Sequence, residues 1–393
     1  MLRNITLLFF LLVYMSSCVE PYNVVVSKYK DLLVVDAQIT NENKSHEVKL
    51  TRSIANLDVT PTLETDAVVI ISCDDGTNEI LKEVEPGVYK TDSVNFIVKV
   101  GGVYTLSIQT SNGKKYHSDK CEILEPTEID RVYFDRNELI SVTNESLEGI
   151  SFFVDGRAAE NSYLRWMYEE GWKFSVPYPT RIGFDENNKL KHIPSKNRYC
   201  WKKSSSNQIL IQSLQSQNTT EIKGKEVCFI PSDNTDKFNM KYAINIKQLR
   251  ISKKEYDFLD KLKESSEEVG DISGTQPFSI KGNIISDTDE DEPVLGYFQT
   301  GSVTSSRVFI DHDEALSLPL FLRDNTPYCP LDTVLLDNER YKVLYDIYEK
   351  FDINGSKRVF DVLPLNSGLL FVYPRCCDCS VTGSLKKPLY WED

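Results

Sequence analysis

The chain has 393 residues, and about 375 of them follow Cys18, a length sufficient for two or three domains with a large hydrophobic core. Its 45 Lys and Arg residues are outnumbered by 59 Asp and Glu residues, so that the net charge is −14. This charge argues against nucleic acid or an anionic membrane surface as the partner, and we attribute the acidity to solubility.

Residues 1–17 have the pattern of a bacterial lipoprotein signal peptide. Arg3 supplies a positive charge, and the apolar run from Ile5 to Tyr14 is too short to span a bilayer. Cleavage before Cys18 would leave a lipidated N-terminus, followed by a tether over residues 18–28. We therefore expect a membrane-anchored protein. The alternative is an ordinary cleaved signal peptide with a chance cysteine.

Residues 29–127 are predicted to form a β-sandwich. Tyr104, Leu106 and Ile108 alternate with polar residues, which is typical of a half-buried strand. About eight such segments in about 100 residues, separated by turn signals such as Asn112-Gly113, indicate an immunoglobulin-like or transthyretin-like architecture. The expected strands are LLVVDAQIT, EVKLTRS, AVVIISC, EILKEV, VYKT, FIVKV, VYTLSIQT and KKYHSD.

Residues 128–393 are predicted to form a larger, irregular β-rich domain with about two helices. Ser252 to Glu255 form a capping box, and Tyr256, Leu259 and Leu262 follow at helical spacing. A second helix is expected over residues 338–351. The expected strands include FFVDG, YLRWMY, QILIQSL, EVCFI, YAINIKQL, VLGYFQT and RVFID.

Eight cysteines remain besides Cys18, and an even number outside the cytoplasm predicts disulfides. They are Cys73, Cys121, Cys200, Cys228, Cys329, Cys376, Cys377 and Cys379. Sequence proximity favours the pairs Cys73 with Cys121 and Cys200 with Cys228, and a link from Cys329 to the C-terminal cluster. The CxxC spacing within that cluster leaves zinc as an alternative, but no second pair or nearby histidine completes a tetrahedral set.

The sequence lacks the common catalytic motifs GxSxG, HExxH, GxxxxGK[ST] and GxGxxG, so that we expect no enzyme and no cofactor. A hydrolase with a dispersed site is an alternative. The acidic run Asp287 to Glu292 resembles the start of a calcium loop but departs from the EF-hand pattern, and Asp311 to Glu314 fits a surface turn. We therefore expect no metal.

Four aromatic residues lie within ten positions: Tyr163, Trp166, Tyr168 and Trp172. Such rings can form a stacking platform for sugars or peptides. In a strand, however, Trp166 and Tyr168 share a face with Leu164, which indicates a hydrophobic core. Both interpretations stay open.

Four segments carry a family resemblance. They are the run from Cys376 to Ser384 that leads to Lys387-Pro388-Leu389-Tyr390-Trp391, the segment YAINIKQLRISKKEYDFLDKLKE, the segment from Gln276 to Asn283, and the segment from Pro293 to Phe298. Together they resemble the domain-of-unknown-function family 4249 from about residue 20 to the end. Cys377 is an extra cysteine, and Tyr390 stands where Phe is expected.

The resemblance implies an outer-membrane lipoprotein of Bacteroidota, of a kind encoded beside SusC-like TonB-dependent receptors. It implies an accessory or binding subunit of such a receptor, in nutrient uptake or macromolecule transport. The alternative is a surface lipoprotein that binds glycan or peptide cargo by itself. The family has no established catalytic residues to carry over.

Overall fold

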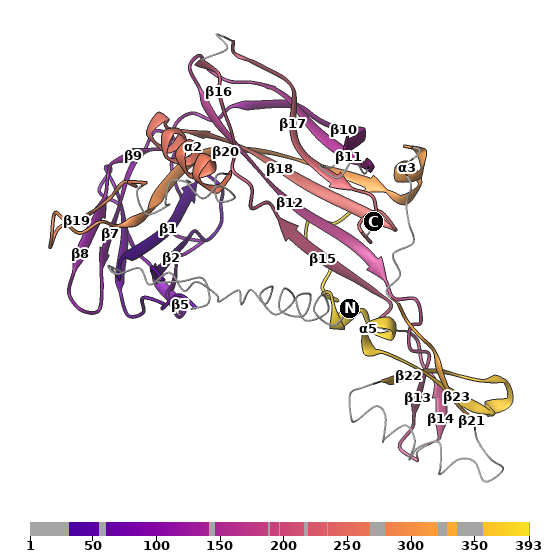
Figure 1. Cartoon of the computed structure of the whole chain (residues 1–393). Coiled ribbons are helices and arrows are strands. Elements are labelled where there is room, and N and C mark those ends of the chain that lie inside the picture. Colours follow the sequence, from indigo (N-terminus) through magenta and orange to yellow (C-terminus); the bar gives the residue numbers. More distant parts are fainter. Residues whose placement is uncertain are drawn as a thin grey trace, which may run out of the picture.

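A computed structural model describes residues 31–54, 60–140, 146–187, 189–195, 197–215, 219–233, 235–267, 280–318, 320, 328–335 and 357–392. The protein is mainly β, as the sequence predicts, with two β-sandwiches and a small C-terminal β subdomain (Figure 1). The expected signal peptide, Cys18, the tether and the helix expected over residues 338–351 lie outside the described residues.

The largest sheet has nine strands and contributes to both sandwiches. Its order is β15-β12-β18-β20-β1-β2-β6-β5, and β16 also pairs with β12. The strands are β1 (Leu33–Thr40), β2 (Glu47–Arg52), β5 (Lys82–Glu85), β6 (Val88–Lys90), β12 (Tyr163–Ser175), β15 (Tyr199–Ser205), β16 (Leu210–Ser213), β18 (Lys241–Ile251) and β20 (Leu295–Asp311).

Strand β20 joins the two halves of this sheet. Residues 295–301 pair in parallel with β1, whereas residues 302–311 pair antiparallel with β18. The pairing partner therefore changes between Gly301 and Ser302. The segments VLGYFQT and RVFID, which the sequence suggests as two strands, belong to this one strand of 17 residues.

The first sandwich is completed by a six-stranded sheet of order β19-β8-β7-β3-β4, with β9 paired to β7. Its strands are β3 (Val68–Cys73), β4 (Asn78–Ile80), β7 (Val103–Gln109), β8 (Lys115–Ser118), β9 (Cys121–Glu122) and β19 (Ile284–Ser286). Buried side chains of both sheets form one core, which confirms the predicted sandwich. Because β19 and the first part of β20 belong to it, this sandwich takes in residues far beyond the expected boundary at residue 127.

One expected strand of this sandwich, FIVKV at residues 96–100, is wrong. Phe96 and Val98 do enter the core, and Ile97 is exposed, as the alternation suggests. No neighbouring strand pairs with the segment among the described residues. Its backbone bonds locally instead: the Phe96 amide donates to the Asp92 carbonyl, and the Lys99 amide donates to the Tyr104 hydroxyl.

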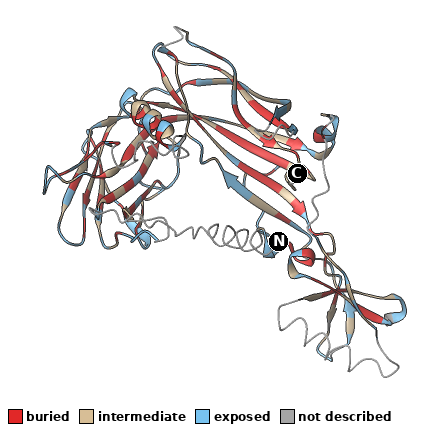
Figure 2. Ribbon diagram, viewed as in Figure 1, coloured by how far each residue is buried: buried red, intermediate tan, exposed pale blue. Residues whose placement is uncertain are grey.

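The second sandwich packs a three-stranded sheet of order β10-β11-β17 against the other half of the nine-stranded sheet. Its strands are β10 (Glu128–Ile140), β11 (Ser146–Arg157) and β17 (Glu221–Pro231). Figure 2 shows buried residues along the strands of both sandwiches. The largest fully buried side chain here is Trp166, whose indole N–H donates to Gln248.

The C-terminal subdomain consists of a hairpin, a three-stranded sheet of order β21-β23-β22 and short helices. These elements are β13 (Ile182–Phe184), β14 (Leu190–His192), β21 (Asp332–Leu335), β22 (Arg358–Val362), η4 (Pro364–Asn366), β23 (Gly368–Val372), α5 (Pro374–Cys377) and η5 (Cys379–Val381).

Two more helices lie outside this subdomain, α2 (Lys253–Glu267) and α3 (His312–Ser317). Within the described residues, no helix is long and apolar enough to cross a membrane.

Helix α2 begins where the capping box predicts. The Glu255 amide donates to the Ser252 hydroxyl at 3.2 Å, and Leu259 is buried while Tyr256 and Leu262 pack against the same cluster. The second half of a capping box would return the Glu255 carboxylate to the Ser252 amide. Here it accepts from the Thr300 amide of β20 at 3.1 Å instead, so that the helix is fixed to the shared strand.

Candidate functional site

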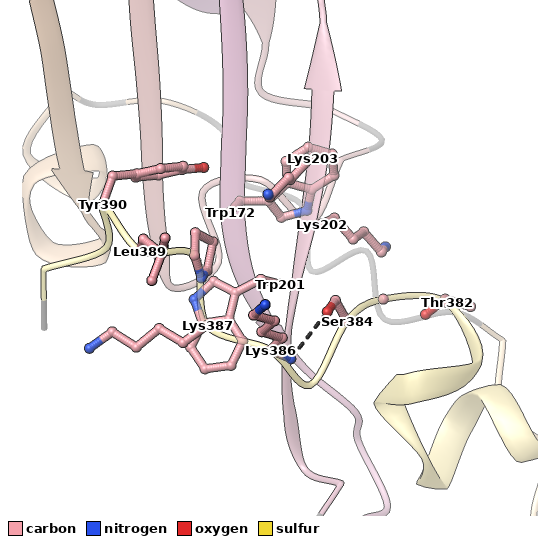
Figure 3. Close-up of a pocket in the computed structure, with 12 residues that line it drawn as sticks. Trp172, Trp201, Lys202, Lys203, Thr382, Ser384, Lys386, Lys387, Leu389 and Tyr390 are labelled. Carbon is pink, nitrogen blue, oxygen red and sulfur yellow. Dashed lines mark hydrogen bonds between the residues drawn. The ribbon is translucent and has the colours of Figure 1, made fainter. Parts of the chain in front are cut away.

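An open pocket of about 720 Å³ lies between strand β15 and the C-terminal tail, defined here as residues 380–392 (Figure 3). This size is within the usual range of ligand pockets. Three aromatic rings and four lysines contribute to its lining, and the described lining includes no Asp or Glu. The lining residues are Trp172, Trp201, Lys202, Lys203, Thr382, Gly383, Ser384, Lys386, Lys387, Pro388, Leu389 and Tyr390.

The C-terminal tail reaches the pocket because a disulfide fixes its start. Cys200 of β15 is bonded to Cys379, with the two Cα atoms 5.6 Å apart, and both lie in the core of the second sandwich. Trp201 is the next residue and points to the opposite face of the strand. Its amide and carbonyl exchange two 2.9 Å backbone hydrogen bonds with Ser384. The tail thus covers the edge of β15 and passes from one face of the sheet to the other.

The end of the tail packs on the outer face of the nine-stranded sheet. The hydroxyl end of Tyr390 reaches Gly171 of β12, and the Arg307 guanidinium lies over one face of the ring, 3.8 Å from its centroid. The buried Trp391 ring makes edge contacts with Trp201 and Phe309. Burial raises the pKa of the Tyr390 hydroxyl, although the positive charge of Arg307 opposes this.

The lysines of the pocket have different surroundings. Lys202 is 2.6 Å from an Asp236 carboxylate oxygen, and the same carboxylate accepts from the Trp172 indole N–H at 2.8 Å. Lys203 and Lys386 are exposed, and no carboxylate among the described residues pairs with either ammonium group. The pocket therefore presents uncompensated positive charge on a chain with an overall charge of −14.

The four rings predicted as a platform do not come together. Trp166 is fully buried, and Tyr168 is partly buried against the same core, so that the core interpretation holds for these two. Tyr163 packs on Tyr256 of helix α2. Trp172 alone of the four lines the pocket.

The cysteine pairing differs from the expectation in two of three places. Cys329 is bonded to Cys376, as expected, but Cys200 is bonded to Cys379 rather than to Cys228. The bonded state of Cys376 and Cys379 also argues against a zinc site at the CxxC spacing, because zinc requires thiolates. Cys228 is a buried free cysteine whose pKa is raised by burial.

The expected Cys73–Cys121 bond is wrong because of strand order. Tyr104 of β7 pairs with Cys73 on one side and with Cys121 on the other. Two strand spacings separate the cysteines by about 10 Å, which is too far for a disulfide. Both are free, and burial raises the pKa of Cys121 to about 12. The expectation that all eight cysteines are oxidised is therefore also wrong.

The two acidic segments are engaged in separate local contacts. Asp287 lies 2.6 Å from the His117 ring, and Glu292 binds the Lys114 ammonium at 2.9 Å, so that these carboxylates point to different partners. Asp311 to Glu314 lead into helix α3 instead of a simple turn, and the His312 ring contacts the Phe238 carbonyl. The described residues contain no group of three or more metal-ligating side chains.

A second group of polar residues is buried where helix α2 meets β12 and β20. Burial raises the pKa of Glu255 to about 7, although its bond from the Thr300 amide and the charge of Arg165 oppose this. Burial also lowers the pKa of Arg165, whose guanidinium donates to Gln299. One Glu255 carboxylate oxygen has no partner among the described residues. Burial of these ionisable groups therefore costs the folded protein free energy.

Trp201 and the lysines of the pocket were not among the predicted site residues. Two signals could have indicated them: Trp201-Lys202-Lys203 and Lys386-Lys387 followed by Tyr390-Trp391 combine aromatic and basic residues at close spacing. Only the disulfide and the Ser384 contact reveal that they belong together.

The fold and pocket define a double β-sandwich protein with a basic, ring-lined pocket. The chain belongs to DUF4249, described as a domain of unknown function, whose sequence profile matches residues 19–307. The C-terminal half of the pocket therefore lies beyond the matched region. No curated protein matches the chain in sequence.

One solved structure with a distant similarity is that of a DUF4785 family protein from Legionella pneumophila subsp. pneumophila str. Philadelphia 1. The identity is 11% and the TM-score 0.18, over 55% of this chain and 52% of that chain. The similarity thus spans about half the length of that protein, and it carries no argument about function.

Proposed function

We propose that the chain is a lipid-anchored binding protein of the outer membrane that serves as an accessory or binding subunit of a SusC-like TonB-dependent receptor. The lipid would be attached at Cys18. Membership of DUF4249 supports this proposal, because the resemblance implies Bacteroidota lipoproteins encoded beside such receptors. The cargo would be a nutrient or a macromolecule, and the chain itself would catalyse no reaction.

The observation that carries the binding role is the pocket between β15 and the C-terminal tail. A disulfide and a backbone bridge hold the wall of the pocket in place, and exposed lysines face it. Such preorganisation lowers the entropy lost when a ligand binds. The second candidate is an autonomous glycan- or peptide-binding lipoprotein, which the aromatic rings of the same pocket support.

Co-purification distinguishes the two candidates. Membranes of the bacterium are dissolved in mild detergent, and the chain is precipitated with an antibody; a strain that lacks the chain is the control. Recovery of a TonB-dependent receptor in an amount comparable to the chain supports the accessory role. Recovery of the chain alone contradicts that role and leaves the autonomous binder.

A further inference from the structure

We propose that the pocket between β15 and the C-terminal tail binds an acidic oligosaccharide, with sugar carboxylates at the lysines and sugar rings on the aromatic side chains. This inference rests on the binding role proposed above and adds the chemical class of the ligand.

The charges of the pocket select an anion. Lys202 is already paired with Asp236, whereas Lys203 and Lys386 are exposed and have no carboxylate partner among the described residues. Lys203 belongs to β15 and Lys386 to the tail, so that each of the two segments that line the pocket contributes one of these lysines. An anionic ligand that reaches both walls gains two charge contacts, and it meets no opposing carboxylate in the described lining.

The rings favour a ligand with flat apolar faces. Trp201 and Tyr390 are partly exposed and line the pocket together with the edge of Trp172. The face of an aromatic ring is electronegative and attracts C–H groups, which one side of a sugar ring presents in a row. The Trp201 ring is held by Trp391, and the Tyr390 ring by Arg307, so that neither needs to be ordered when a ligand binds.

The backbone argues against an extended peptide. A peptide that adds to a sheet requires unpaired amide and carbonyl groups at an exposed strand edge. At Trp201 this edge of β15 is occupied, because the Trp201 amide and carbonyl already exchange hydrogen bonds with Ser384. Recognition beside Trp201 therefore relies on side chains, and a ligand that carries rings and carboxylates fits them.

The test uses the full lipidated chain in detergent and follows tryptophan fluorescence. The probes are tetrasaccharides of galacturonate, mannuronate and hyaluronan. Methyl-esterified tetragalacturonate keeps the rings without the charges, and tetraglutamate keeps the charges without the sugar rings. We expect at least one acidic tetrasaccharide to bind about tenfold more tightly than the ester and tetraglutamate, and less tightly as salt is raised.

The variant Lys203→Gln/Lys386→Gln should weaken that binding about tenfold. The matched control Lys82→Gln/Lys120→Gln changes two exposed lysines of the first sandwich and should leave it unchanged. Failure of all three acidic tetrasaccharides, equal binding of the ester, tighter binding of tetraglutamate or single-stranded DNA, or an unaffected pocket variant would each overturn the inference. The titration contains no receptor, so that its outcome is independent of the co-purification experiment.

Discussion

The Tyr390 hydroxyl occupies the space that a side chain at Gly171 would need. A Cβ atom at Gly171 would lie 2.3 Å from the hydroxyl oxygen but 3.5 Å from the ring carbon that carries it. The absence of a side chain in the middle of β12 thus allows the C-terminal tail to lie on the sheet and to form one wall of the pocket.

This contact predicts a pair of compensating substitutions. Gly171→Ala should displace the Tyr390 ring and destabilise the protein by about 1–2 kcal/mol, because the added methyl group overpacks the contact. In Gly171→Ala/Tyr390→Phe the hydroxyl is gone, and the remaining 3.5 Å distance is an ordinary contact, so that stability should return. Thermal denaturation of both variants, with Tyr390→Phe alone as the control, measures the effect. Equal destabilisation of the single and double variants would contradict the contact.

The Cys200–Cys379 disulfide should be a major source of stability. It closes a loop with a sequence separation of 179 residues, which the chain-entropy model values at about 5 kcal/mol. Cys200→Ser/Cys379→Ser should therefore lower the free energy of unfolding by several kcal/mol and weaken ligand binding, because the tail loses its fixed start. Urea denaturation measures the first effect.

The control for the disulfide is Cys228→Ala, which changes a buried cysteine outside the two bonds. Its unfolding should stay sensitive to a reducing agent, whereas that of the double serine variant should lose much of this sensitivity. Peptide mapping without reduction should recover the peptide of Cys200 joined to that of Cys379. A Cys200–Cys228 peptide would show the pairing to be wrong.

The buried Glu255 carboxyl should make stability depend on pH. Its pKa is about 7 in the folded protein against the ordinary value of 4.5, so that the folded state holds the proton more tightly. The contribution of Glu255 to the free energy of unfolding is therefore greatest below about pH 4.5. It is lost as the pH rises to 7 and above, and the loss is at most about 3 kcal/mol. Glu255→Gln keeps an acceptor for the Thr300 amide and should be more stable than the wild type at pH 8.

Wild type and Glu255→Gln must be compared at the same pH, because His46 changes the stability of both proteins with pH in the opposite direction to Glu255. Burial lowers the pKa of His46 from 6.5 to about 4, so that its contribution to stability is full above pH 6.5 and is lost as the pH falls to 4. In the difference between Glu255→Gln and wild type this effect cancels. The difference, measured by urea denaturation, should approach zero near pH 4. A difference that does not change with pH would rule out the raised pKa.

Cys18→Ala should release the protein from the membrane fraction. Loss of the thiol would remove the proposed attachment point of the lipid, and no second apolar segment in the sequence approaches 18 residues. Fractionation after a high-salt wash, together with labelling by radioactive fatty acid, measures this. Ser17→Ala is a control that keeps the cysteine. A Cys18→Ala protein that stays with the membrane would contradict the anchor.

Local patterns predicted local structure well. The capping box at Ser252 marks the start of helix α2, and the alternation of Tyr104, Leu106 and Ile108 marks a strand with one buried face. In both cases the residues that form the pattern are the same residues that form the helix start or the strand. The mainly β class and the first sandwich follow from many such segments.

Contacts between segments that are far apart in the sequence could not be predicted from such local patterns. Nothing in the sequence states that β1 pairs with β20 across some 260 residues, or that Cys200 meets Cys379 instead of Cys228. The pocket depends on the second of these contacts, because the Cys200–Cys379 bond brings the tail to β15 from a distant part of the sequence. Of the residues proposed as a platform, only Trp172 therefore lies at the pocket.

The shared strand β20 sets the order in which the parts of the protein can fold. A chain that emerges N-terminus first presents β1 long before residues 284–301, which supply β19 and the parallel partner of β1. Until then the edge of β1 is open, and open strand edges promote aggregation. The first sandwich must therefore stay incomplete while some 180 further residues are delivered, and during that time the edge of β1 can pair with a strand of another chain.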